Sequence, residues 1–303
     1  MPTSTEHVVT PALLREWPLP DVAGSKYGRG QIVVVGGALR SPGAAMLSGV
    51  AALRVGAGRL TLAVARSVAA SVATSIIEAG VVPLDETDED HVDGSSIRLA
   101  SSDVGGADTV LVGPGLDDPG ETERLLTDLL PLLDGESSVV LDAFALGVLP
   151  NLPEVVDGLR GRLVLTPNKN EAARLLERGD GDEAGSPDDV REIARRYDAV
   201  VSCFGVVASP DGETWTIGTG TGGLATSGSG DVLAGAITGL CARGATPEQA
   251  AVWASFAHVA VGVRLARDIA PLGFLASEML DVLPGVIAEI PAHAQEMRTA
   301  ELR

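Results

Sequence analysis

Aliphatic runs recur along the chain, separated by segments whose apolar residues repeat at helical spacing. Runs dominated by Val, Leu and Ile are typical of strands that are buried on both faces of a parallel sheet. The pattern predicts strands over 31–35, 59–65, 109–112, 138–142, 162–166, 199–203 and 214–218. It predicts helices over 42–55, 121–133, 170–177, 187–197, 231–242 and 247–267.

The alternation of strands and helices predicts an α/β fold with a doubly wound, mostly parallel sheet and helices on both faces. We expect one domain over 1–303, with an N-terminal extension at 1–21 and a tail at 293–303 that is frayed or serves as an interface arm. The acidic segment 85–93 is expected to be a solvated loop. Ligands of such folds bind beyond the carboxyl ends of the strands, where this chain carries Gly-rich or Asp-containing turns.

The net charge and the cysteine content limit which binding partners and metal sites are expected. The formal net charge of −19 argues against binding to nucleic acid or to anionic membranes. An anionic ligand would therefore be held by backbone N–H groups and helix dipoles. The two cysteines, Cys203 and Cys241, form neither a metal-binding spacing nor a disulfide framework. With no signal peptide at the start of the chain, we expect a cytoplasmic protein.

The segment 221–240 contains the most informative turn, Gly228-Ser229-Gly230-Asp231, directly before a helical pattern. Unsatisfied N–H groups at a helix start form an anion site, and glycine lets a phosphate approach closely. Asp231 could accept a proton from an attacking hydroxyl as a general base. It could equally serve only as a first-turn acidic residue that stabilises the helix. No Gly-Lys-Ser/Thr follows, so this is not a Walker loop.

Several motifs occur together in a fixed order. They include 225–235 around Asp231, Gly36-Gly37 followed by 51–58, Val112 to Leu116, Leu141-Asp142-Ala143, Thr166-Pro167 with Glu171-Ala172, and Ala257-His258. This ordered set, which extends over about 26–283, resembles the ADP/ATP-dependent NAD(P)H-hydrate dehydratases, which have the ribokinase-like fold.

The resemblance implies a repair reaction on the S epimer of hydrated NADH or NADPH. ADP or ATP, with Mg²⁺, would phosphorylate the ring hydroxyl, and loss of phosphate would restore the ring. Asp231 would be the catalytic base, and no metal ligand is expected from the protein. The nucleotide and its transferred phosphoryl group would be bound by Thr226, Gly228, Ser229 and Gly230. The hydrated dinucleotide would be bound by Ala44, Gly115, Asp142, Asn168 and Asp231. Resemblance alone also implies a homo-oligomer.

The chain departs from the family pattern at four places. Asn168 stands where the family usually has His, and Phe204 stands where a Lys precedes Gly. Thr221-Gly222-Gly223 replaces Asn-Pro-Gly, and Phe144 replaces a second Asp. Lys169 either supplies the missing cation or is a solvated residue at a helix start. Two alternatives stay open: a related kinase acting on a vitamin precursor alcohol, and a catalytically weak paralogue that binds nucleotide or dinucleotide.

Overall fold

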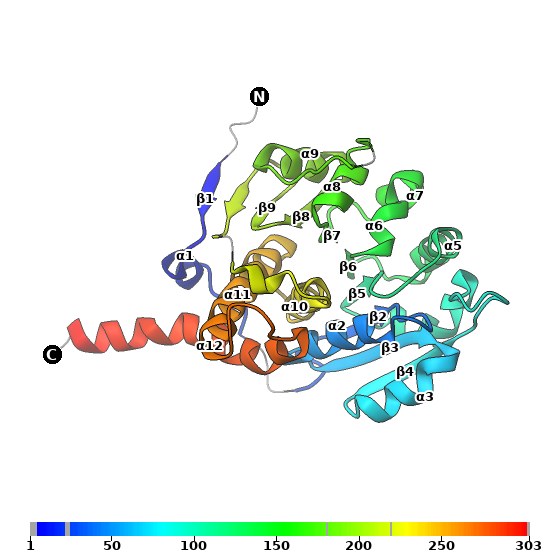
Figure 1. Cartoon of the computed structure of the whole chain (residues 1–303), viewed down its shortest axis with the longest axis horizontal. Helices are drawn as coiled ribbons and strands as arrows, with labels where there is room; N and C mark the ends of the chain where they lie inside the picture. Colours follow the sequence, from blue (N-terminus) through cyan, green and yellow to red (C-terminus); the bar gives the residue numbers. More distant parts are fainter. Residues whose placement is uncertain (1–4, 22–24, 180, 219, 302–303) are drawn as a thin grey trace.

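A computed structural model describes residues 5–21, 25–179, 181–218 and 220–301, with side chains described as far as Ile290. Its centre is a ten-stranded sheet in the order β1-β10-β9-β8-β7-β6-β5-β2-β3-β4, with helices on both faces (Figure 1). β9 runs antiparallel to both of its neighbours, and the other neighbouring pairs are parallel. The doubly wound, mostly parallel sheet predicted from the sequence is confirmed.

The strands are β1 (Glu6–Val8), β2 (Gln31–Val35), β3 (Arg59–Ala65), β4 (Ala79–Leu84), β5 (Thr109–Val112), β6 (Ser138–Leu141), β7 (Leu163–Leu165), β8 (Ala199–Cys203), β9 (Val206–Ala208) and β10 (Thr214–Thr216). The chain proceeds from β2 outward through β3 and β4, then returns to place β5 on the other side of β2. The winding direction therefore reverses between β2 and β5, which is where doubly wound sheets form their ligand crevice.

The helices of more than one turn are α1 (Pro11–Glu16), α2 (Pro42–Arg54), α3 (Arg66–Ser75), α5 (Pro119–Leu129), α6 (Phe144–Val148), α7 (Pro153–Gly158), α8 (Lys169–Leu175), α9 (Pro187–Tyr197), α10 (Ser229–Ala242), α11 (Pro247–Asp268) and α12 (Ala276–Glu301). Shorter turns are η1 (Gly94–Ala100), α4 (Ser101–Val104), η2 (Leu130–Leu132), η3 (Leu149–Asn151) and η4 (Gly222–Leu224). Helices α2, α10, α11 and α12 pack against one another, as do α5, α6, α8 and α9 in succession.

Helix α10 lies unusually close to α2. A Cβ built on Gly235 would be 2.1 Å from the Ser48 carbonyl oxygen, and one on Gly239 would be 2.5 Å from the Ala52 carbonyl oxygen. Only glycine permits this approach of the two backbones. The crossing fixes the axis of α10, and with it the place where its first turn emerges at the sheet edge.

Several elements near the edges of the sheet are absent from the sequence-based prediction: β1, α1, α3, β4, β9 and α12. β4 contains Gly80 and Pro83, which a half-exposed edge strand tolerates but which weaken its sequence pattern. The extension 1–21 contributes β1, which pairs with β10, so this segment belongs to the sheet from Glu6 onward. The tail 293–303 is helical as far as Glu301, and its last two residues lie outside the described part.

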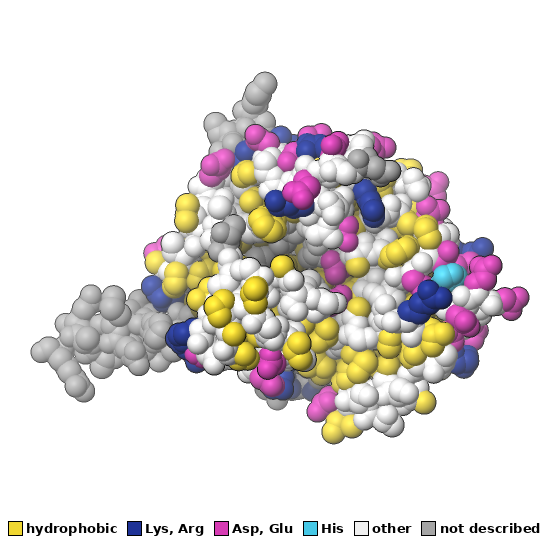
Figure 2. All heavy atoms as spheres, in the orientation of Figure 1, with side chains coloured by type: hydrophobic (Ala, Val, Ile, Leu, Met, Phe, Trp, Pro, Cys, Tyr) yellow, Lys and Arg dark blue, Asp and Glu magenta, His cyan; other side chains and the backbone are white. Residues whose placement is uncertain are grey.

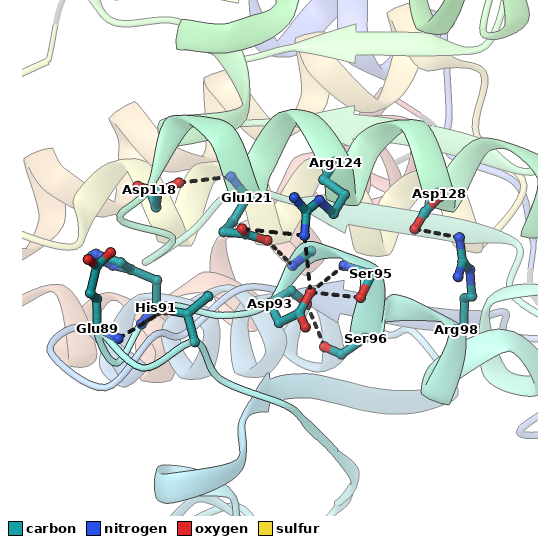
Figure 3. Close-up of polar contacts among 12 residues, drawn as sticks. Glu89, His91, Asp93, Ser95, Ser96, Arg98, Asp118, Glu121, Arg124 and Asp128 are labelled. Carbon is teal, nitrogen blue, oxygen red and sulfur yellow. Dashed lines mark hydrogen bonds and ion pairs between the residues drawn. The ribbon is translucent and has the colours of Figure 1, made fainter.

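The acidic segment 85–93 is a loop, as predicted, closed by a bridge between Glu86 and Val92. His91 Nδ1 lies 3.0 Å from the Asp117 carboxylate. The Glu121 carboxylate on α5 accepts a hydrogen bond of 2.8 Å from the Gly94 N–H at the start of η1. Figure 3 shows Arg124 of α5 reaching Asp93 at the end of the loop, an ion pair of 4.0 Å. The loop is thus held against the segment that follows Gly115 at the sheet edge.

Candidate active site

The carboxyl ends of the central strands are joined by backbone hydrogen bonds. The Gly37 N–H donates to the Pro114 carbonyl at 2.8 Å, the Asp142 N–H to Val112 at 3.1 Å, and the Thr166 N–H to Leu141 at 3.2 Å. The predicted strand-end turns therefore lie side by side at one edge of the sheet. Figure 2 shows this face hollowed near its centre, with Asp or Glu side chains on the wall of the hollow.

Ala44 and Gly115, both predicted to contact the dinucleotide, are neighbours. Gly115 has a φ of +77°, and a Cβ built on it would be 2.3 Å from the Ser41 carbonyl oxygen and 3.3 Å from the Ala44 Cβ. The turn after β5 thus touches the start of α2 without any intervening side chain. This leaves a surface formed by backbone and one methyl group, against which a flat ring can lie.

The Gly228 turn begins α10. Gly228 adopts a φ of +88°, and a Cβ there would be 2.5 Å from the Leu47 Cδ1 atom. The Ser229 N–H donates to the Thr226 carbonyl at 3.2 Å, so it is engaged within the turn. For the N–H groups of Gly228, Gly230 and Asp231, no acceptor lies within hydrogen-bond distance among the described residues. These three N–H groups can donate hydrogen bonds to a bound anion.

Asp231 is partly buried in this first turn. Burial, and next the charge of Asp142, raise its pKa to about 7. Asp142 follows β6 and is itself buried; burial raises its pKa to about 6, against a hydrogen bond of 2.7 Å from the Thr166 hydroxyl. A carboxyl group with a pKa near neutrality is suited to general-base catalysis at physiological pH.

A third carboxyl group, Glu171, belongs to the same cluster. Burial raises its pKa to about 7, and the charges of Asp142 and Asp231 add to the effect, while a hydrogen bond from the Asn168 N–H lowers it. In the sequence, Glu171 stands out only as part of the Thr166-Pro167 motif. The spacing of Asn168 and Glu171, which is that of a capping box, was the available signal for its position.

Asn168 caps helix α8. Its side-chain oxygen accepts hydrogen bonds from the Asn170 N–H at 2.9 Å and the Glu171 N–H at 3.0 Å, and Glu171 accepts from the Asn168 N–H at 2.9 Å. The exposed Asn168 side chain thus has its oxygen committed to the helix. Its NH₂ group is the part that can donate to a ligand.

Lys169 and Phe204 meet at the ends of the neighbouring strands β7 and β8. The Lys169 ammonium lies 4.4 Å from the centroid of the Phe204 ring and 3.3 Å from the Glu183 carboxylate. Phe204 is 64% exposed. Lys169 therefore brings a positive charge to the strand end where the expected Lys is absent, but the same ammonium is paired with the Glu183 carboxylate.

The donor set is compatible with a bound nucleotide and a phosphate-held cation. In the described ranges, no group of three His, Cys, Asp or Glu side chains stands close enough to hold a metal ion. Mg²⁺ in nucleotide sites is commonly bound by substrate phosphates and one or two carboxylates, so such a group is not required. In the same ranges, no helix is long and apolar enough to cross a membrane.

Comparison with known proteins identifies the family. A family model described as NAD(P)H-hydrate dehydratase matches residues 32–285. An ADP-dependent (S)-NAD(P)H-hydrate dehydratase from Xanthomonas campestris is 39% identical in an alignment of 289 residues that covers 93% of this chain and 96% of the relative. A bifunctional NAD(P)H-hydrate repair enzyme from Moorella thermoacetica is 35% identical over 99% of this chain, but the chain spans only 58% of that protein.

Solved structures agree on the fold. An ADP/ATP-dependent NAD(P)H-hydrate dehydratase from Bacillus subtilis, co-crystallised with ATP and Mg²⁺, is 25% identical with a TM-score of 0.71, covering 94% of this chain and 98% of that one. A ribokinase-like superfamily protein from Enterococcus faecalis is 21% identical with a TM-score of 0.78, covering 94% and 96%. The fold is ribokinase-like, as predicted, and the chain belongs to the NAD(P)H-hydrate dehydratase family.

Proposed function

We propose that this protein uses ADP or ATP to dehydrate the S epimer of hydrated NADH or NADPH, restoring the reduced dinucleotide. The observation that carries the proposal is Asp231, a partly buried carboxyl group with a pKa of about 7 beside the free N–H groups of a helix start. The Xanthomonas relative, an ADP-dependent (S)-NAD(P)H-hydrate dehydratase that matches over nearly its whole length, supports the same reaction.

The substrate would lie along the strand ends, with its hydrated ring toward Asp231. Ala44 and Gly115 provide the flat contact surface described above. Asn168 donates from its NH₂ group, and the buried Asp142 carboxylate, fixed by Thr166, accepts from a substrate hydroxyl or amide. The nucleotide would occupy the side of the turn that faces Thr226, with its terminal phosphate at the start of α10.

In the first step, the ring hydroxyl attacks the terminal phosphorus while Asp231 accepts the hydroxyl proton. The bond from phosphorus to its leaving oxygen breaks, and ADP departs from ATP, or AMP from ADP. The N–H groups of Gly228 and Gly230 stabilise the charge that develops on the equatorial oxygens. The Ser229 N–H does not stabilise the phosphoryl group directly, because it already donates to the Thr226 carbonyl. Ser229 acts by holding the shape of the turn.

In the second step, the carbon–oxygen bond of the phosphorylated ring breaks and inorganic phosphate leaves with the former hydroxyl oxygen. A proton is then lost from the adjacent ring carbon, and the double bond of the reduced nicotinamide forms. Mg²⁺ would supply neutralisation of the charge on the nucleotide phosphates, and the protein would hold it mainly through those phosphates.

The cysteines and the net charge bear on where the protein works and which macromolecules it binds. Cys203 and Cys241 are buried free thiols, which suits a reducing cytoplasm. The net charge of −19 supports a protein that binds neither nucleic acid nor anionic membranes. We further propose a homo-oligomer, which size-exclusion chromatography with light scattering would test directly.

The test is recovery of NADH absorbance from hydrated NADH, run side by side with ADP and ATP. Recovery with either nucleotide supports the proposal, and no recovery above blank with both would refute it. The rate should rise with pH and level off above about 7, because the base acts in its ionised form and its pKa is about 7. Phosphorylation of thiazole or pyrimidine alcohols without hydrate repair would point to the kinase alternative.

A further inference from the structure

His258, on helix α11, reaches across to the first residue of α10. Its Nε2 atom lies 2.9 Å from the Ser229 hydroxyl oxygen and 3.0 Å from the Ser229 carbonyl oxygen. Its sequence neighbours Ala257 and Val259 are apolar, as expected around a residue that only packs within a helix layer. Instead, one nitrogen is aimed at two oxygens of the turn that carries the proposed chemistry.

The contacts determine where the imidazole proton sits. A carbonyl oxygen can only accept, so the contact with the Ser229 carbonyl requires a hydrogen on Nε2. Burial lowers the pKa of His258 to about 4, so the ring is neutral at physiological pH and this is its single N–H. That N–H is shared between the two Ser229 oxygens.

Ser229 is thereby fixed at three atoms. Its N–H donates to the Thr226 carbonyl, and both its hydroxyl and its carbonyl accept from His258. The residues on either side, Gly228 and Gly230, have no side chains with which to hold their own peptide planes. The Gly228 carbonyl accepts from the Val232 N–H at 3.1 Å, but Ser229 is the residue between the two glycines whose side chain is anchored. The directions of the free N–H groups of the turn therefore depend in part on Ser229.

We propose that His258 is a positioning residue for phosphoryl transfer, which orients the N–H groups of the α10 turn by holding Ser229. The inference rests on the proposed function of that turn. It differs from a general contribution to stability, because both hydrogen-bond contacts of the imidazole among the described residues go to the first turn of α10.

A matched control lies on the same helix. Ser255, one turn earlier on α11, forms a buried hydrogen bond of 2.9 Å to the Ser202 hydroxyl on β8. Its loss removes a side-chain hydrogen bond between α11 and another element without touching the α10 turn. Comparing the two positions separates orientation of the site from loss of a buried hydrogen bond.

The experiment compares the full-length variants His258→Phe, His258→Gln and Ser255→Ala for the kcat and KM of hydrate repair, with the Tm measured in parallel. His258→Phe removes the hydrogen-bond donor. It should lower kcat roughly 10- to 100-fold and raise the KM for the nucleotide, while the KM for the hydrate stays unchanged. His258→Gln places an amide donor near the Nε2 position and should restore kcat to within about threefold of wild type. Ser255→Ala should lower the Tm but leave kcat unchanged.

Measuring nucleotide binding tests the positioning role of His258 even if the proposed reaction is wrong. If wild type repairs no hydrate, the proposed function fails, and titration of ADP and ATP against the same variants still tests the positioning role. Weaker binding in His258→Phe alone, recovered in His258→Gln, supports it. Equal binding and turnover in folded His258→Phe, or an equal loss in Ser255→Ala, would overturn it.

Discussion

Replacing Asp231 with asparagine should abolish turnover and, at pH 8, make the protein more stable. The ordinary pKa of this carboxyl is 3.8, and burial and the Asp142 charge raise it to about 7 in the folded protein. The difference corresponds to roughly 4 kcal/mol, at about 1.4 kcal/mol for each tenfold change. The positive end of the α10 dipole stabilises the ionised carboxylate by up to about 1 kcal/mol, which would be lost in the variant, so we expect a gain of roughly 3 to 4 kcal/mol.

The gain should depend on pH in a defined way. Below pH 4, Asp231 is protonated in both the folded and the unfolded chain, and asparagine brings no advantage. Between pH 4 and 7 the folded wild type retains a proton that the unfolded chain has lost, so its stability falls as pH rises. The advantage of the variant should therefore grow through this window and level off above about pH 7.

Urea unfolding of wild type and Asp231→Asn at several pH values between 5 and 8.5 measures the difference. Asp189→Asn provides a control in which the expected change in stability has the opposite sign. Burial opposes the Asp189 charge, but hydrogen bonds from the Gly185 N–H, from Ser186 and from Arg178 outweigh it and hold its pKa below 3.8. That variant should lose stability at neutral pH. Equal stability of wild type and Asp231→Asn across the whole range would refute the reasoning about a destabilised base.

Other substitutions test the geometry of the site. Gly228→Ala should lose activity and cost about 1–3 kcal/mol of stability, chiefly because its φ is +88° and also because a Cβ would be 2.5 Å from Leu47 Cδ1, which would have to move. Gly230→Ala is the matched control, because a Cβ there meets nothing within 4 Å; thermal melts should show a small change. Gly115→Ala, whose Cβ would be 2.3 Å from the Ser41 carbonyl, should weaken hydrate binding in titrations, and unchanged affinity would contradict the contact surface proposed there.

The central strands could be predicted closely because each is a buried aliphatic run with few competing signals. The predicted strand over 59–65 coincides with β3, and that over 109–112 coincides with β5. The edges were harder. β9 has only three residues, and the pairing of β1 with β10 joins segments that are far apart in the sequence. Neither short strand offers the length or alternation that a sequence pattern needs.

The site could be predicted in location but not in its internal contacts. A glycine-rich turn before a helix is visible in the sequence, and so is Asp231 within it. The engagement of the Ser229 N–H by Thr226 depends on the local path of the turn. The reach of His258 to Ser229 depends on how α11 packs against α10. The spacing of Asn168 and Glu171 already indicated a helix-capping role for Asn168. The family resemblance instead implied a substrate contact at this position.

The central claim is that phosphorylation of the ring hydroxyl precedes its loss, at the turn around Asp231. It is tested most directly by preparing the hydrate in ¹⁸O-water, so that the ring hydroxyl carries the label, and running the repair with ATP in ordinary water. Mass spectrometry of the released inorganic phosphate should then find one ¹⁸O atom for each NADH restored. Label in the water and none in the phosphate would contradict the account.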